Sequence, residues 1–352
     1  MSLLALLQDA VNQAPVTAPL ATVASGAPTF WEHHLSPDLI RIPFWKIGPI
    51  QDGLPIRYYS LAYLLGLALA WKALGALARR RLIGLTETMV ADLVIPFALI
   101  GVMAGGRIGY LLFYDVDPTT HQYTWLDRPM KIFEIWEGGM ASHGGVLGVL
   151  LAMVWFARSR RVPLLHLLDL CSLTAPIGLF LGRVANFING ELWGRATTVS
   201  WAVLFREAPA TDPAFVAAHP ELKSFFERGL CPRHPSQLYE ALGEGLLIGL
   251  TLLAFRKKLQ PKSGALTSLF LLGYGVARIV SEQFREPDAQ IGYQWLGLTR
   301  GQMLTSVMLV GGIVLAFRSL RGKTQGWSVP PVETEPESES DPKPTATRGA
   351  SR

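Results

Sequence analysis

Long apolar runs dominate the pattern of hydrophobic and polar positions along this chain. Runs of about 20 apolar residues recur, and a helix of that length crosses a hydrocarbon core of roughly 30 Å. The runs do not alternate with a period of two, as the strands of a transmembrane β-barrel would. We therefore predict an all-α polytopic membrane protein with seven transmembrane helices, at about Tyr58–Ala78, Met89–Phe113, Gly144–Ala157, Leu164–Ile188, Gln237–Phe255, Ala265–Phe284 and Met303–Phe317.

Basic clusters follow the first, third, fifth and seventh runs, so they share one side of the membrane if the N-terminus lies outside. The clusters are Arg79–Arg81, Arg158–Arg161, Arg256–Lys262 and Arg318–Lys323. Cytoplasmic loops carry an excess of Lys and Arg, which makes that side cytoplasmic and the C-terminus cytoplasmic too. The other loops are then expected outside: Tyr114–Ser142, Glu191–Pro235 and Arg285–Gly301.

The pattern also divides the chain into regions. Residues 1–55 lack the basic start of a signal peptide and are expected to form an extracytoplasmic or interfacial arm. Residues 56–323 would form the membrane domain, in which the polar insert 191–235 folds as a small extracytoplasmic lobe. Residues 324–352 are rich in Pro, Glu, Ser and Thr and are expected to be a disordered cytoplasmic tail.

Composition agrees with a membrane location. Of 352 residues, 50% are hydrophobic and only 17% are charged, which argues against an ordinary soluble enzyme. Much of the positive charge behind the net +5 lies beside the spans, so topology and anionic lipids explain it without a nucleic-acid partner. The two cysteines, Cys171 in a span and Cys231 in a polar loop, predict neither a disulfide framework nor a CxxC metal site.

One stretch breaks the apolar pattern most sharply. Leu181–Gly194, LGRVANFINGELWG, follows the apolar run Pro163–Phe180 and carries an arginine, two asparagines and a glutamate. A helix would place Arg183, Asn186 and Gly190 on one stripe, which would suit a phosphate. The same residues fit a helix end at which the arginine snorkels and the asparagines cap. The stretch alone favours neither interpretation.

Further polar residues resist a structural explanation, and the predicted topology brings them to the same outer membrane face. They are Tyr59, Arg107, His143, Arg183, Asn186, Glu191, His234, Glu240 and Arg285. Residues of this kind at the margin of a span usually face a cavity or a partner. Their convergence favours a shared polar site over chance.

Three of these residues have specific alternatives. His143, in ASHGG, could exchange a proton near neutral pH or simply bond a backbone carbonyl, and its glycines allow close approach by a lipid or another helix. Glu240, in HPSQLYEA, follows a start signal in which Ser236 could cap a helix, but its carboxylate needs a partner such as an arginine. Arg285 either marks the interface or is a second cation aimed at the same phosphate as Arg183.

These motifs resemble those of the bacterial prolipoprotein diacylglyceryl transferases. The family signature Gly-Arg-x-x-Asn-Phe-x-Asn-x-Glu-x-x-Gly is matched completely from Gly182 to Gly194, and the resemblance covers about Ile42–Lys323. Further similar blocks occur in the family's order: Ile56–Gly66, Gly105–Tyr110, His143–Gly145, Arg233–Ala241 and Arg285–Asp288.

The resemblance implies a seven-span enzyme of the bacterial inner membrane with its active site toward the extracytoplasmic side. It would move the diacylglyceryl group of phosphatidylglycerol onto the lipobox cysteine of a prolipoprotein signal peptide, releasing glycerol 1-phosphate. Arg183 would bind the headgroup, Arg285 would assist as the phosphate departs, and His143 is the candidate general base, unless a thiol polarised by arginine needs none. Further residues would orient the headgroup or the arginines: Tyr59, Asn186, Glu191, Gly194 and Glu240.

No metal or organic cofactor is implied, because the phosphodiester already contains an adequate leaving group, and His143 and His234 are too few for a zinc site. Two other functions use similar features. Another phospholipid enzyme, such as a hydrolase or headgroup transferase, would share the arginines and differ in the acceptor. A transporter would show internal repeats and broken helices near mid-membrane, and the sequence contains no such repeat.

Overall fold

The computed structural model describes residues 28–42, 54–117, 122–134, 139–208, 213–286 and 300–322. Most of the predicted arm, the loop after residue 286 and the predicted tail lie outside these residues. The larger helical segments are α2 (Tyr58–Arg79), α3 (Glu87–Pro96), η1 (Phe97–Gly105), α4 (Gly106–Phe113), α6 (Ser142–Ser159), α7 (Leu164–Asn189), α10 (Ser236–Glu240), η5 (Ala241–Leu247), α11 (Ile248–Leu259), α12 (Ala265–Glu282) and α13 (Arg300–Leu320).

Each apolar run of the sequence is helical. Among the described residues, five continuous helices are long and apolar enough to cross a membrane: Tyr58–Arg79, Glu87–Phe113, Leu164–Asn189, Ser236–Leu259 and Ala265–Glu282. Two shorter apolar helices, His143–Ser159 and Thr305–Leu320, coincide with the predicted third and seventh spans. The structure is therefore that of a helical polytopic membrane protein, whereas the seven-span topology stays a prediction. The sixth run ends earlier than predicted, because residues 283–284 form a turn after α12.

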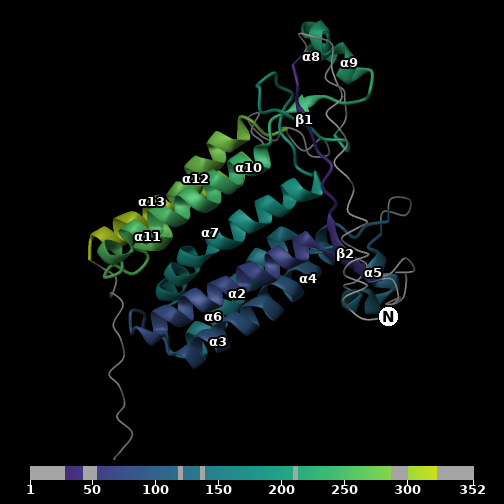
Figure 1. Ribbon diagram of the computed structural model, residues 1–352. Helices are drawn as coiled ribbons and strands as arrows, with labels where there is room; N and C mark the ends of the chain where they lie inside the picture. Colours follow the sequence, from purple (N-terminus) through teal and green to yellow (C-terminus); the bar gives the residue numbers. More distant parts are fainter. Residues whose placement is uncertain are drawn as a thin grey trace, which may run out of the picture.

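Helix α7 lies between two groups of helices (Figure 1). It contacts α2 on one side and η5, α11 and α12 on the other. One apolar core joins α2, α3, α6 and α7, and a second joins α7, α11 and α12. The central position of α7 explains why a polar group on it can meet residues from several other helices.

Glycines let α6 approach η1 and α4 closely. A Cβ atom added to Gly109 would lie 2.6 Å from the Gly144 Cα, and one added to Gly148 would lie 3.0 Å from the Gly105 Cα. Small residues four apart allow helix backbones to approach in this way. Of the two glycines that follow His143, Gly144 therefore serves contact with another helix.

A buried carboxylate fixes the start of α12. Asp169, in α7, accepts hydrogen bonds from the backbone N–H groups of Gly264 at 2.7 Å and Thr267 at 2.8 Å, and from the Thr267 hydroxyl at 2.7 Å. The N-terminus of a helix has unpaired N–H groups and favours negative charge. The contact holds α12, which carries part of the site, against α7.

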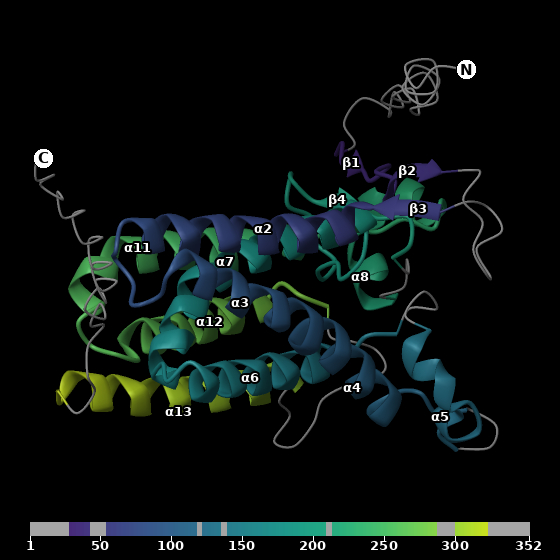
Figure 2. The ribbon, with the colours of Figure 1, turned by 90° about the horizontal axis from the view of Figure 1, so that it is seen from below.

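Small strands and helices gather at one end of the bundle (Figures 1 and 2). They are β1 (Trp31–Glu32), β2 (Asp38–Ile42), β3 (Leu54–Arg57), β4 (Val203–Leu204), β5 (Pro232–Arg233), α8 (Pro213–Ala218), η4 (Pro220–Leu222) and α9 (Lys223–Phe226). In the sheet β1-β4-β5, β1 pairs parallel with β4, and β4 pairs antiparallel with β5. β2 and β3 form an antiparallel pair, and β3 leads directly into α2. The polar insert therefore folds together with β1 of the N-terminal region.

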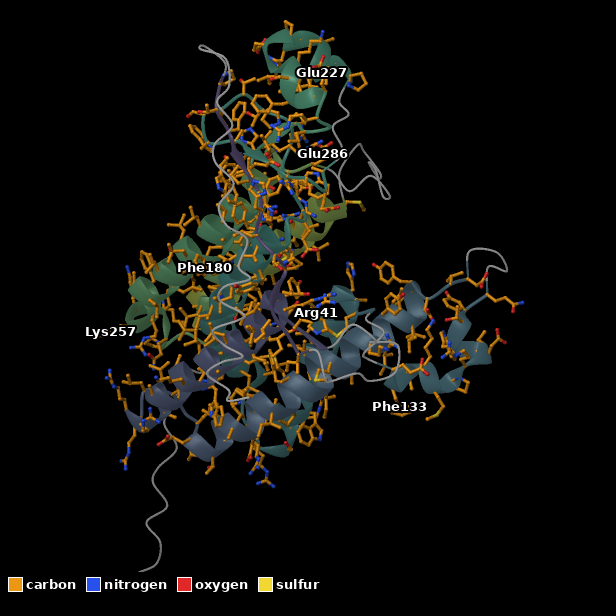
Figure 3. All side chains as sticks on the ribbon, turned by 45° about the vertical axis from the view of Figure 1, so that its right-hand side comes forward. Arg41, Phe133, Phe180, Glu227, Lys257 and Glu286 are labelled. Carbon is orange, nitrogen blue, oxygen red and sulfur yellow. The ribbon has the colours of Figure 1, made fainter. Side chains whose placement is uncertain are left out.

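The lobe has an apolar core of its own. Phe30 packs with Leu204, Leu222 and Phe225, so a residue from the N-terminal region completes this core. Figure 3 shows Glu227 of the lobe and Lys257 of α11 at opposite ends of the molecule. Two shorter helical turns, α5 (Thr124–Asp127) and η2 (Pro129–Phe133), lie beyond α4 (Figure 2).

Candidate functional site

Arginines and glutamates from α7, α10, η5, α12 and the residues just after α12 meet inside the bundle, at its lobe end. The cluster consists of Arg183, Glu240, Glu244, Arg278, Glu282 and Arg285. Three arginine charges balance three glutamate charges. Buried charges are tolerated only when they are paired and hydrogen-bonded, and removing one partner typically costs about 3–5 kcal/mol.

Glu240 is the centre of the cluster. Its Oε2 lies 3.0 Å from Arg183 Nη1, and its Oε1 lies 2.5 Å from Arg278 Nη1 and 3.4 Å from Arg285 Nη1. The prediction that this carboxylate needs an arginine is confirmed. The structure also brings Arg183 and Arg285 to the two oxygens of one carboxylate, as a shared anion site requires.

Glu244, one turn further along, repeats the arrangement. Arg183 Nη2 lies 3.1 Å from Glu244 Oε2, and the Ser281 hydroxyl donates to Glu244 Oε1 at 3.2 Å. Arg278 lies 3.5 Å from Glu244 Oε1 and pairs with Glu282 at 2.7 Å. Arg183 is thus clamped by two carboxylates, which excludes the interpretation that it snorkels to the interface.

The burial of the cluster shows which of its side chains are accessible. The side chains of Glu240 and Glu244 are fully buried, whereas those of Arg183, Arg278 and Arg285 are 17%, 11% and 11% exposed. A guanidinium carries five N–H donors, so two contacts to glutamates leave donors for a further anion. The glutamates therefore act as a backing layer that orients the arginines, and the arginines form the accessible layer.

The end of α7 adds an amide layer. The side-chain amides of Asn186 and Asn189 both donate to Glu191 Oε1 at 3.2 Å, and Gln237 donates to the Glu191 backbone carbonyl at 2.6 Å. The prediction that Arg183, Asn186 and Gly190 lie on one stripe of a helix is wrong for Gly190. α7 ends at Asn189, and Gly190 has φ +67°, the left-handed conformation that ends helices.

Tyr59 joins the same region from the first turn of α2. Its hydroxyl lies 3.3 Å from that of Tyr63, and it is close enough to Glu191 and Arg183 to interact with both electrostatically. The structure thus brings Tyr59 of α2 together with Arg183 and Glu191, which lie close to each other in the chain at the end of α7.

Gly194 lies where the lobe crosses the end of α12. It forms a β-bridge with Arg285, and a Cβ atom on it would lie 2.5 Å from the Phe284 carbonyl and 2.6 Å from the His234 carbonyl. The next residue, Arg195, donates from its backbone to the Phe284 carbonyl at 2.8 Å. Close backbone packing therefore explains the glycine, and its orientation of a headgroup stays a prediction.

His143 is not joined to the cluster. It is exposed in the first turn of α6, and within the described residues no hydrogen bond or ion pair involves its side chain. Arg107, in contrast, is buried and donates to the backbone carbonyls of Lys131 at 2.5 Å and Glu134 at 2.9 Å. Arg107 thus holds the η2 loop, whereas the role of His143 as a base stays a prediction.

His234 and Ser236 act at the junction of lobe and bundle. His234 Nδ1 lies 3.2 Å from the Tyr239 hydroxyl, which also accepts from the Trp201 indole at 2.6 Å. Burial lowers the pKa of His234. Ser236 does not cap α10 as predicted; its hydroxyl donates to the Leu192 carbonyl at 3.1 Å and ties the helix start to the lobe.

Sequence reasoning missed Glu244, Arg278 and Glu282. Two signals were available: Glu244 follows Glu240 by four residues, and Arg278 precedes Glu282 by four within an otherwise apolar run. Both spacings place side chains on one helix face. No group of three or more His, Cys, Asp or Glu side chains is placed to hold a metal ion in the part of the chain that the structure describes.

The fold and the site define a polytopic membrane protein in which buried glutamates present arginines at one end of a helix bundle. The chain belongs to the prolipoprotein diacylglyceryl transferase family, whose model matches residues 46–318. The resemblance inferred from the motifs is therefore confirmed.

Curated relatives agree along most of their length. A protein of Serratia proteamaculans (strain 568) is 41% identical over 284 residues, covering 80% of this chain and 93% of the relative. A protein of Rhodospirillum rubrum is 43% identical over 291 residues, covering 81% and 97%. A protein of Bradyrhizobium diazoefficiens is 41% identical over 293 residues, covering 80% and 94%. All three are named phosphatidylglycerol–prolipoprotein diacylglyceryl transferase.

Proposed function

We propose that this protein transfers the diacylglyceryl group of phosphatidylglycerol to the lipobox cysteine thiol of prolipoproteins. Family membership and the names of the relatives support the activity. The observation that carries it in the structure is the pair of guanidiniums, Arg183 and Arg278, held by Glu240 and Glu244 beside apolar helices. Such a site suits an anionic headgroup that is attached to hydrocarbon.

The reaction is a substitution at the glyceryl carbon that bears the phosphate. Sulfur attacks that carbon, a C–S bond forms, and the C–O bond to the phosphate breaks. The electron pair of the C–O bond leaves with glycerol 1-phosphate, and the thiol proton passes to a base or to the departing phosphate. The thiol, with an ordinary pKa of about 8.5, must become more thiolate-like, and the charge of the leaving group must be neutralised.

The arginines meet the second demand. Arg183 would bind the headgroup phosphate through its remaining N–H donors, because two glutamates fix the orientation of its guanidinium. Arg278 and Arg285 would stabilise the charge that grows on the departing phosphate, since both contact the same oxygen of Glu240. Pre-oriented donors of this kind need no rearrangement when the charge develops.

The remaining predicted residues would act around this centre. Asn186, Glu191 and Tyr59 would position the glycerol end of the headgroup, because Asn186 donates to Glu191 and Tyr59 interacts electrostatically with Glu191 and Arg183. His143 would accept the thiol proton, with a thiol polarised by arginine as the alternative. Gly194 would keep the lobe backbone close to Arg285.

The predicted topology completes the proposal. The protein would cross the bacterial inner membrane seven times, with the N-terminus and the site on the extracytoplasmic side. Its support is the position of a basic cluster: Arg256, Lys257 and Lys258 lie in the last turn of α11, at the end of the molecule opposite the lobe (Figure 3). Residues 191–235 would then form the extracytoplasmic lobe of the membrane domain 56–323.

A transfer assay tests the function. Purified protein is incubated with phosphatidylglycerol labelled in its acyl chains and with a peptide carrying a Leu-x-Gly-Cys lipobox. Label is expected on the cysteine, and a peptide with serine in place of that cysteine is the control. Label released as free diacylglycerol, with none on the peptide, would identify a hydrolase. If label neither reaches the peptide nor leaves the phospholipid in any lipid or detergent, both the transferase and the hydrolase hypotheses are contradicted.

A further inference from the structure

An apolar groove of about 530 Å³ runs between η5–α11 and α12. It extends from Leu269 and Thr251 at one end to Tyr239, Ser281 and Phe284 at the other. Leu269 and Ser281 are twelve residues apart on α12, which corresponds to roughly 18 Å along the helix axis. The groove is therefore long, narrow and parallel to the helices.

One end of the groove reaches the arginine–glutamate cluster. The hydroxyl of Ser281, which lines the groove, donates to Glu244 Oε1 at 3.2 Å. The lining residues Tyr239 and Phe284 directly precede Glu240 and Arg285 in the chain. The apolar groove therefore ends beside the charged site, with Ser281 at the border between them.

Two glycines in the groove are not required by helix packing. A Cβ atom on Gly243 would meet Ala277 at 3.7 Å, and one on Gly273 would meet Ile248 at 3.7 Å, both ordinary contacts. Gly245 and Gly275 differ, because a Cβ atom there would lie 2.6 Å and 2.5 Å from its nearest neighbour, and neither lines the groove. The effect of Gly243 and Gly273 is to keep the groove open.

We propose that this groove holds one hydrocarbon chain of the lipid substrate while the lipid's phosphate lies at Arg183 and Arg278. The proposal rests on the proposed function and adds the subsite that binds the lipid's tail. The lining is apolar apart from a few hydroxyls, so a polar headgroup or a charged peptide would not be stabilised in it. The exposed rim residues Leu247 and Val276 leave the groove accessible from the surrounding hydrocarbon.

Filling the groove tests the proposal through chain-length selectivity. Gly243→Leu and Gly273→Leu are compared with the unmodified protein on dioctanoyl and dipalmitoyl phosphatidylglycerol, using the transfer assay above. The ratio of kcat/KM for the long lipid to that for the short lipid is expected to fall at least about tenfold, because one methylene that no longer fits an apolar pocket already changes kcat/KM roughly 10–200-fold. Gly311→Leu is the matched control: a Cβ atom there meets only Leu271 at 4.0 Å, and Gly311 does not line the groove.

Photocrosslinking provides a readout that does not need activity. Phosphatidylglycerol with a diazirine at mid-chain is added as a minor component to phosphatidylcholine nanodiscs containing the unmodified protein. Peptides of η5 and α12 are expected to be labelled about tenfold more than those of α13, and unlabelled phosphatidylglycerol should compete. This photocrosslinking experiment also tests the proposal if the leucine variants fail to fold.

The outcomes separate the two proposals. If the unmodified protein transfers the lipid and both folded glycine variants keep its chain-length ratio, the proposal that the groove binds a hydrocarbon chain is wrong. The proposed transferase function would then still stand. If the unmodified protein transfers nothing, the proposed function is wrong. The photocrosslinking result alone then tests whether the groove binds a hydrocarbon chain. Equal labelling of η5, α12 and α13 would show only ordinary contact with bilayer lipid and would contradict the proposal that the groove binds a hydrocarbon chain.

Discussion

At the scale of single residues, a charge in this site is defined by its neighbours. Arg183 contributes two nitrogens to two different carboxylates, so its planar fork is fully oriented before any ligand arrives. Lysine carries the same charge on a compact ammonium group and cannot reproduce that geometry. The identity of the cation should therefore matter as much as its charge.

Arg183→Lys is expected to lower transfer about 10²–10³-fold, because one pre-oriented set of donors to a developing oxyanion is lost. Transfer rates on labelled phosphatidylglycerol measure the effect. Arg206→Lys is the control, since Arg206 pairs with Glu32 on the exposed lobe. Near-normal transfer by a folded Arg183→Lys protein would contradict the role given to its guanidinium.

His33 is a second residue whose state depends on its surroundings. Its Nε2 lies 2.7 Å from the Phe187 carbonyl at the end of α7, and its ring packs against Phe187 and Phe205. Burial lowers the pKa of His33 below the ordinary 6.5, and the bond to the Phe187 carbonyl offsets this only in part. His33 is therefore neutral at neutral pH and connects the N-terminal region to the helix that carries Arg183.

This shift has a definite sign. Below about pH 6.5 the unfolded chain binds a proton at this position more readily than the folded one, so stability is present above that pH and lost as pH falls. Melting temperatures in detergent are expected to drop more between about pH 7.5 and 5.5 in the unmodified protein than in His33→Phe. His34→Ala, at the exposed neighbouring position, should behave like the unmodified protein. An equal drop in His33→Phe would remove His33 as the cause.

At the scale of elements, the helices are placed by two kinds of contact. α12 is set against α7 by polar contacts, through Asp169 at one end and the arginine–glutamate cluster toward the other. α6 is set against η1 and α4 by the absence of side chains on facing glycines. Within a membrane both devices replace the hydrophobic force that drives helices together in water.

Gly144→Val is expected to separate α6 from α4, because even a Cβ atom at this position would lie 2.7 Å from the Gly109 Cα. Protein that elutes as a single species in detergent should fall several-fold, measured by fluorescence-detected size exclusion. Gly145→Val is the control, since a Cβ atom there meets only the Val102 carbonyl, at 3.9 Å. Equal yields of the two variants would show that the glycine contact does not hold the helices.

At the scale of the whole molecule, the lobe and the basic end of α11 lie at opposite ends (Figure 3). If the predicted orientation holds, Glu227 of the lobe faces the outside and Lys257 faces the cytoplasm. Both positions are exposed, so the chemistry of a probe there should report its compartment and not local burial.

Glu227→Cys, in a Cys231→Ser background, is expected to react with a membrane-impermeant maleimide in intact spheroplasts, and Lys257→Cys only after lysis. The native Cys171 lies within α7 and provides the baseline. Labelling of Lys257→Cys before lysis, with Glu227→Cys protected, would invert the topology. Labelling of both would contradict a span between them.

The sequence by itself determined the class of this protein. Apolar runs must become helices in hydrocarbon, because every backbone polar group there needs an internal partner. The signature around Arg183 likewise identified the family, and the run starting at His234 indicated that Glu240 required an arginine. These inferences rest on local pattern, which a linear chain displays directly.

Only the tertiary structure decided which charges meet. Glu240 and Arg278 are 38 residues apart, and Arg183 and Glu244 are 61 apart, so no local pattern pairs them. The sequence predicts Arg278 only as part of an apolar span and Gly190 as part of a helix stripe, whereas Arg278 pairs with Glu240 and Gly190 lies just beyond the end of α7. Packing around α7 sets these distances, because a buried charge is acceptable only where another element brings its partner.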